Sequence, residues 1–140
     1  MTDPHVPMER LKQDVTSITL VNNTAKTEDV TVPQGERWSL LSVKMANADD
    51  VDRVVQCDVY KEVAKTNLIK RLLYETCTAN DKHRQWPCHT TATSGNTMGD
   101  YAPVILDAGN TLEFTWAAGG ASAGAVDADG LVVEYLKVEI

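Results

Sequence analysis

The sequence predicts an all-β protein, a two-sheet antiparallel β-sandwich of jelly-roll type with about eight strands. Two segments, 32–41 and 106–116, each place a glycine-containing turn before a strand-like run. In the second segment Leu112, Phe114 and Trp116 alternate with polar residues, the pattern of a strand with one face in a core and one in water. Short candidate strands separated by turn-rich pieces recur along the chain, as is typical of a sandwich.

The residues of the two turns support this prediction. Pro33 is expected to preset φ at the first central position of its turn. Gly35 and Gly109 can adopt the positive φ that is costly for other residues. Both turns are therefore expected to lead directly into a strand.

The predicted strands are bounded by pieces rich in Asn, Asp, Ser and Gly. They cover 15–21, 28–32, 38–46, 53–60, 67–75, 101–106, 111–117 and 131–140. A helix over 61–73 is an alternative for one segment, because Val63, Leu68, Leu72 and Leu73 nearly fit one helical face. Asn67, in the middle of that run, disfavours the helix.

Length and charge restrict the class of protein. A chain of 140 residues can form one compact domain with its own core. Its net charge of -7 disfavours nucleic acid as a partner, because phosphate recognition needs clustered Lys and Arg. No apolar run approaches the ~20 residues that cross a bilayer, and the N-terminus does not resemble a signal peptide. We therefore expect a soluble protein made in a cytoplasm, with no membrane partner.

Residues 1–12 are predicted to form an N-terminal extended arm, and residues 13–140 the sandwich domain. Prolines within the arm prevent regular strand pairing, and isolated apolar residues there could anchor it on a partner. The candidate partner-binding residues of the arm are Pro4, Val6, Pro7, Met8 and Leu11.

The segment 77–100 lacks a convincing hydrophobic period and is predicted to be an irregular loop. Such a long connection inside a compact domain usually has a function. The loop is therefore the leading candidate for recognition of a partner or ligand. Its candidate binding residues are His83, Arg84, Trp86 and His89.

Two cysteines and two histidines of this loop form a possible ligand set. Cys77, His83, Cys88 and His89 would suit zinc by residue type, but their spacing does not match the usual zinc motifs. A disulfide between Cys77 and Cys88 is a second possibility, formed outside a reducing compartment, and unpaired thiols are a third. Cys57 alternates with valines and is expected to be a small buried apolar residue.

Other candidate sites do not match a known chemical pattern. Cys88 with His83 or His89 lacks an orienting third group for nucleophilic catalysis. Two aspartate-rich segments, 49–52 and 127–129, could hold calcium but do not match the twelve-residue calcium loop. We therefore predict no catalytic residue, no metal and no cofactor.

The three tryptophans also allow a carbohydrate-binding interpretation, because indole faces stack on sugar rings. Trp116 continues an apolar strand face, and Trp38 opens a strand where aromatics commonly cover the end of a sandwich. Core packing thus accounts for both. Trp86 is the one that lies in the predicted irregular loop.

Four runs of residues carry a family resemblance. They are 32–43 (VPQGERWSLLSV), 53–55 (RVV), 105–112 (ILDAGNTL) and 131–135 (LVVEY). Their pattern and order resemble small β-sandwich proteins encoded in tailed-bacteriophage structural gene clusters, in which a VPxGxRWxLLSV strand opens the sandwich and an LxAGxTL turn comes late. The resemblance covers about residue 30 to the end of the chain and does not include the arm or the 77–100 loop.

The resemblance implies a virion component such as a head decoration or cement protein. The expected function is thus a non-enzymatic phage structural protein that binds the major capsid protein or other virion proteins. We expect a homotrimer, located in the virion after assembly in the host cytoplasm.

Two alternatives remain open at this point. The first is a host-surface or glycan-binding module of a tail or head fibre, which would use Trp86 and its loop. The second is a cupin-like enzyme, which needs clustered histidines on strands. His5, His83 and His89 all fall outside the predicted strands.

Overall fold

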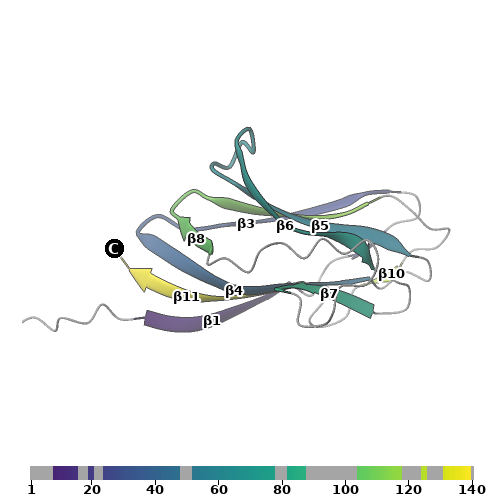
Figure 1. The fold of residues 1–140 in the computed structure, drawn as a ribbon, viewed down its shortest axis with the longest axis horizontal. Coiled ribbons are helices and arrows are strands. Elements are labelled where there is room, and N and C mark those ends of the chain that lie inside the picture. Colours follow the sequence, from purple (N-terminus) through teal and green to yellow (C-terminus); the bar gives the residue numbers. More distant parts are fainter. Residues whose placement is uncertain are drawn as a thin grey trace, which may run out of the picture.

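The computed structural model describes residues 8–15, 19–20, 24–47, 52–77, 82–87, 104–117, 124–125 and 131–139. Within them two antiparallel sheets face each other (Figure 1). One sheet has five strands: β1 (Met8–Val15), β11 (Leu131–Glu139), β4 (Glu36–Asn47), β7 (Lys82–Trp86) and β8 (Val104–Asp107). The other has four: β3 (Lys26–Thr31), β9 (Thr111–Trp116), β5 (Arg53–Tyr60) and β6 (Leu68–Cys77). A short pair joins β2 (Thr19–Leu20) to β10 (Gly124–Ala125).

The predicted all-β sandwich is confirmed. The strands run β1-β11-β4-β7 in one sheet, with β8 also paired to β4, and β3-β9-β5-β6 in the other. This arrangement pairs the first strand with the last, β3 with β9, and β5 with β6. Such nested pairing favours the jelly roll, which stays a prediction. The described residues contain no helix, so the helical alternative for 61–73 is wrong.

The boundary of the predicted arm is wrong, because its last residues belong to the fold. Strand β1 pairs with β11 from Met8 opposite Val138 to Val15 opposite Leu131, and Leu11 packs partly buried against the core. The sheet therefore includes the part of the predicted arm from Met8 onward. The other candidate arm residues, Pro4, Val6 and Pro7, lie outside the described residues.

The two glycine turns that the sequence indicated contact each other. Gly35 and Gly109 have φ of 83° and 88°, values at which glycine avoids strain. The Val32 amide donates to the Asn110 carbonyl at 3.0 Å, and the Gly109 amide donates to the Val32 carbonyl at 2.9 Å. The expected position of Pro33 within its turn is wrong. The Glu36 amide donates to the Pro33 carbonyl, so Pro33 is the first residue of the turn and not its first central residue.

A β-bulge keeps the long strand β4 facing the core. Tyr135 pairs with Leu40 and Glu134 pairs with Ser42, so Leu41 is an extra residue in β4. The bulge shifts the alternation by one residue. As a result Trp38 and Leu40 before it and Val43 and Met45 after it are all buried.

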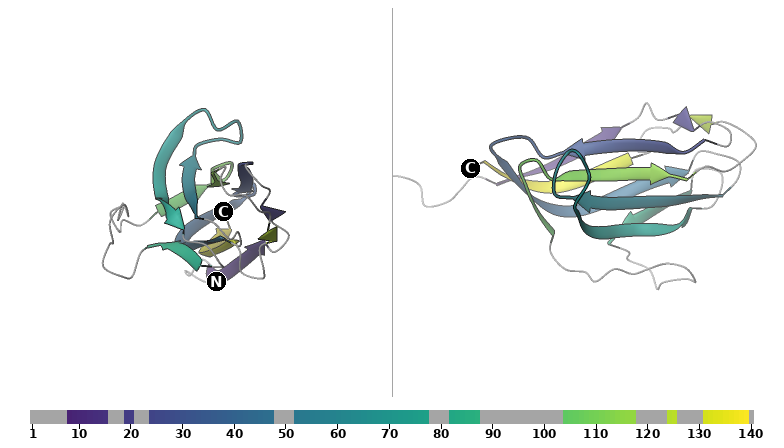
Figure 2. Two further views of the ribbon diagram at one scale, coloured as in Figure 1. Left: turned by 90° about the vertical axis from the view of Figure 1, so that its right-hand side faces the viewer. Right: turned by 90° about the horizontal axis from the view of Figure 1, so that it is seen from above.

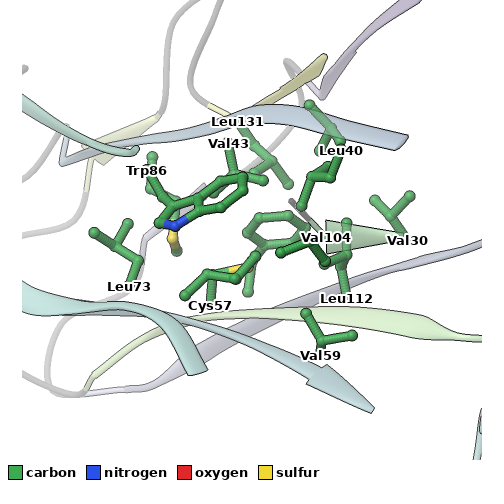
Figure 3. Packing of buried hydrophobic residues seen from close by; sticks show 14 of the residues in the cluster. Val30, Leu40, Val43, Cys57, Val59, Leu73, Trp86, Val104, Leu112 and Leu131 are labelled. Atoms are coloured by element: carbon green, nitrogen blue, oxygen red, sulfur yellow. The ribbon is translucent and has the colours of Figure 1, made fainter. Parts of the chain in front are cut away.

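The core lies between the two sheets, as Figure 3 shows. Leu112, Phe114 and Trp116 are each 0 % exposed, which confirms the predicted buried face. The Trp116 indole N–H donates to the Ala46 carbonyl at 2.8 Å and so links the two sheets. Trp38 is also fully buried and stacks on Tyr135 with ring centroids 3.7 Å apart. Both tryptophans are therefore core residues, as expected.

Candidate functional site

Trp86 is not an exposed recognition residue. It ends β7, pairs with Val43 of β4 and is 3 % exposed within the core (Figure 3). The interpretation of this segment as irregular is wrong for 82–86, which form a strand. The rest of the predicted loop from Cys88 to residue 100 lies outside the described residues, and this includes His89.

The two residues that precede Trp86 in the candidate set have different environments. Arg84 Nε lies 2.5 Å from Glu75 Oε1, and Glu75 is itself buried on β6. This ion pair joins one sheet to the other, so Arg84 stabilises the sandwich. Most of the His83 side chain on β7 is exposed to solvent. The part that is buried lowers the pKa of its imidazole, and the positive charges of Lys44 and Arg84 lower it further.

The cysteines of the described residues are buried. Cys57 is 0 % exposed, as predicted, and burial raises the pKa of its thiol. Burial also raises the pKa of the Cys77 thiol to about 11. The Cys77–Cys88 disulfide stays a prediction because Cys88 lies outside the described residues. Among the side chains that the structure does describe, no group of three or more His, Cys, Asp or Glu could hold a metal ion.

The feature that sequence reasoning missed is the hairpin formed by β5 and β6. Figures 1 and 2 show its connecting loop rising away from the four-stranded sheet and curling over it. The register of the two strands shifts twice, which leaves Leu72 and Ile69 as extra residues in β6. Bulges bend a strand and increase its twist, and two of them account for this projection.

One carboxylate organises the loop at the tip of the hairpin. Glu62 Oε1 accepts hydrogen bonds from the amides of Thr66 and Asn67 at 2.8 and 2.9 Å and from the Thr66 hydroxyl at 3.1 Å. Glu62 Oε2 accepts from the Asn67 side-chain amide at 2.7 Å. These bonds lower the pKa of Glu62 to about 2, with those from Asn67 contributing most.

A lysine then holds the loop over the outer face of the sheet. Lys65 Nζ lies 2.6 Å from Glu113 Oε2 and 3.1 Å from Asp29 Oδ2, two carboxylates that are neighbours on β9 and β3. These contacts raise the pKa of Lys65. Lys65 has φ of 57°, unusual for a residue with a side chain, so the tertiary contacts hold the backbone in this conformation.

The two strands next to the tip loop are joined by a further ion pair. Arg71 Nε lies 2.9 Å from Asp58 Oδ1, whose side chain is 2 % exposed. The Gln56 side-chain amide donates to Asp58 as well, so this buried carboxylate is well satisfied. The Arg71 guanidinium also lies 5.0 Å from the centre of the Tyr74 ring. Contacts in the tip loop and in the adjoining part of both strands therefore fix the hairpin.

This rigid loop presents apolar side chains to solvent. Val63, Leu68 and Ile69 are 62 %, 52 % and 56 % exposed. Lys61 and Lys70 flank them and form no ion pair with a described residue. We name these five residues the hairpin patch. Exposed apolar side chains flanked by two lysines on a preorganised loop are suited to binding a protein surface.

The sequence signal for this patch was ambiguous. Leu68 and Ile69 lie in the predicted strand 67–75, and Val63 and Leu68 lie on the alternative helical face, so neither interpretation predicts an exposed apolar loop. Glu62, followed by Thr66 and Asn67, marks a local side-chain-to-backbone turn, and this was the signal that could have identified a loop.

Searches of protein-family models, of curated proteins and of solved structures each return no match to this chain. In the described segments there is no helix long and apolar enough to span a membrane.

Proposed function

We propose that the protein is a non-enzymatic structural component of a phage virion that decorates or cements the capsid as a homotrimer. One observation carries the proposal furthest. Two of the four runs that carry the phage resemblance, 32–43 and 105–112, form a single structural unit. Their turns exchange the two backbone hydrogen bonds of Val32, and β4 pairs with β8 from Arg37 opposite Asp107.

A side-chain contact strengthens the same unit. Arg37 Nε lies 2.8 Å from Asp107 Oδ1, and Arg37 is the arginine of the VPxGxRW motif. The two motifs therefore depend on each other for their structure in this chain. This supports treating the resemblance as one of three-dimensional structure.

The structure also offers what a decorating protein needs. A rigid sandwich carries a projecting loop whose exposed apolar residues can be buried on a partner. The glycan-binding alternative, by contrast, depended on Trp86 as a stacking platform. With Trp86 in the core, that alternative loses the residue that motivated it.

Binding to particles tests the proposal. Purified protein is mixed with phage particles assembled without it, the particles are sedimented through a cushion, and the bound protein is quantified against the major capsid protein. We expect saturable binding at a fixed ratio. Complete particles are the matched control, because their sites are already filled and they should take up little added protein. Absence of binding to the deficient particles would refute the proposal.

A further inference from the structure

We propose that the hairpin patch binds an acidic surface on a second copy of this chain, in a head-to-tail contact. The inference names the surface through which copies associate. Only the number of copies, three, rests on the proposed function. Self-association itself is measured on the purified chain without particles.

Exposed apolar side chains are concentrated on the hairpin patch. Five large apolar residues of the described chain are substantially exposed, and Val63, Leu68 and Ile69 of the patch are three of them. The other two, Tyr74 on β6 and Ile105 on β8, lie outside the patch. Clusters of this kind mark interaction sites more often than single exposed residues do.

The loop that carries the hairpin patch is held in place by contacts within the chain. The hydrogen bonds to Glu62 and the contacts of Lys65 with Asp29 and Glu113 fix the backbone that carries the patch. A preordered loop loses little conformational entropy when it binds. These polar contacts all lie within one chain, and they leave the apolar side chains facing outward.

The tip of the hairpin differs in charge from the rest of the chain. Residues 61–71 contain four basic residues and one acidic residue, which leaves 9 basic and 19 acidic residues for the rest of the chain. Lys65 and Arg71 are ion-paired with carboxylates of the same chain, so Lys61 and Lys70 give the tip its positive charge. Any other copy of the chain offers the complementary charge, and opposite potentials steer and orient association.

Charge also determines the geometry of the contact. A symmetric contact of tip with tip would place Lys61 and Lys70 of both copies together, which like-charge repulsion disfavours. The favoured contact joins the tip of one copy to a different, acidic surface of the next. Asp52, which is exposed, immediately precedes β5 at the end of the hairpin opposite to its tip. Head-to-tail contacts close into rings when the rotation permits, and a trimer is such a ring.

Sedimentation velocity on the purified full-length protein tests the inference, over a concentration series. We expect an oligomer for the unmodified chain. The double variant Lys61→Glu with Lys70→Glu should weaken association by about tenfold or more, and so should Val63→Ser with Ile69→Ser. Association should also weaken at about 1 M salt, where the Debye length is about 3 Å.

Matched controls separate the patch from general effects. Lys44→Glu alters charge on β4, and Ile105→Ser removes an exposed apolar residue on β8; both should leave association unchanged. A thermal melt of each variant verifies folding. Lys61, Val63 and Ile69 are exposed and Lys70 is half-buried, so both pairs of substitutions should be tolerated.

A mixing experiment tests the head-to-tail geometry. A fluorescently labelled Lys61→Glu, Lys70→Glu variant should sediment with unlabelled wild-type protein, because it keeps the acidic surface that receives the wild-type tip. Failure of the labelled variant to join wild-type oligomers would overturn the head-to-tail contact. A wild-type chain that is monomeric at all concentrations would overturn the inference, and particle binding by that monomer would leave the proposed function standing.

Discussion

Phe114 is the residue whose truncation tests the sandwich most directly. It lies at the centre of β9, which pairs with β3 on one side and β5 on the other, and it is 0 % exposed. Across the strand pair it faces the same side as Cys57, its register partner on β5. Phe114→Ala would remove the ring and leave a cavity between two sheets whose backbones are held by hydrogen bonds.

The expected loss of stability follows from this environment. Burial of the ring contributes transfer free energy, and incomplete collapse of the sheets adds a cavity term, for a total of about 3–5 kcal/mol. Small domains have unfolding free energies of about 5–15 kcal/mol, so the variant should be close to unfolding.

Urea denaturation followed by tryptophan fluorescence measures the effect, because Trp38, Trp86 and Trp116 are all buried in the same core. Ile105→Ala is the matched control: Ile105 is 52 % exposed, and its truncation should change stability by no more than about 0.5 kcal/mol. A loss below about 1 kcal/mol for Phe114→Ala would show that the register of β9 is wrong.

Three further predictions concern the hairpin, the first strand and the thiols. Because the pKa of Glu62 is lowered from 4.5 to about 2 in the folded protein, ionised Glu62 stabilises the fold above about pH 4.5, and this stabilisation is lost as the pH falls toward about 2. Thermal melts over this pH range should therefore show a smaller decrease in melting temperature for Glu62→Gln than for the unmodified protein. Deleting residues 2–7 should leave the melting temperature nearly unchanged, whereas deleting 2–15 removes β1 from β11 and should lower it markedly; equal melts would place β1 outside the cooperative fold. A chelator should leave the melting temperature unchanged, and a drop accompanied by stoichiometric zinc would instead indicate a metal site at Cys77 or its neighbours.

The elements that the sequence predicted best have a regular period and a buried face. β9 alternates without interruption, and its partner β5 carries Val55, Cys57 and Val59 at the same spacing, all 0 % exposed. Positive φ at Gly35 and Gly109 was also predictable, because few other residues tolerate it. In these places local sequence and tertiary packing favour the same structure.

The strands that were missed depend on partners far away in the sequence. β1 has mixed charges, with Leu11 packed against the core, and it is held by eight register pairs with β11 near the other end of the chain. β7 has five residues, of which Trp86 alone is large and apolar. It joins the sheet by pairing with β4. Such strands carry too few apolar residues for the period to be visible.

The bulges explain why residues 61–73 could be interpreted as a strand or as a helix, and they also account for the exposed hairpin patch. Each of the three bulges in β4 and β6 coincides with a pair of adjacent apolar residues: Leu40–Leu41, Leu68–Ile69 and Leu72–Leu73. An extra residue in a strand interrupts the alternation, and two such pairs four residues apart imitate the spacing of a helical face. In β6 the same extra residues bend the hairpin out of the sheet. The irregularity that made 61–73 resemble a helix is thus what carries Leu68 and Ile69 from the core to the exposed patch.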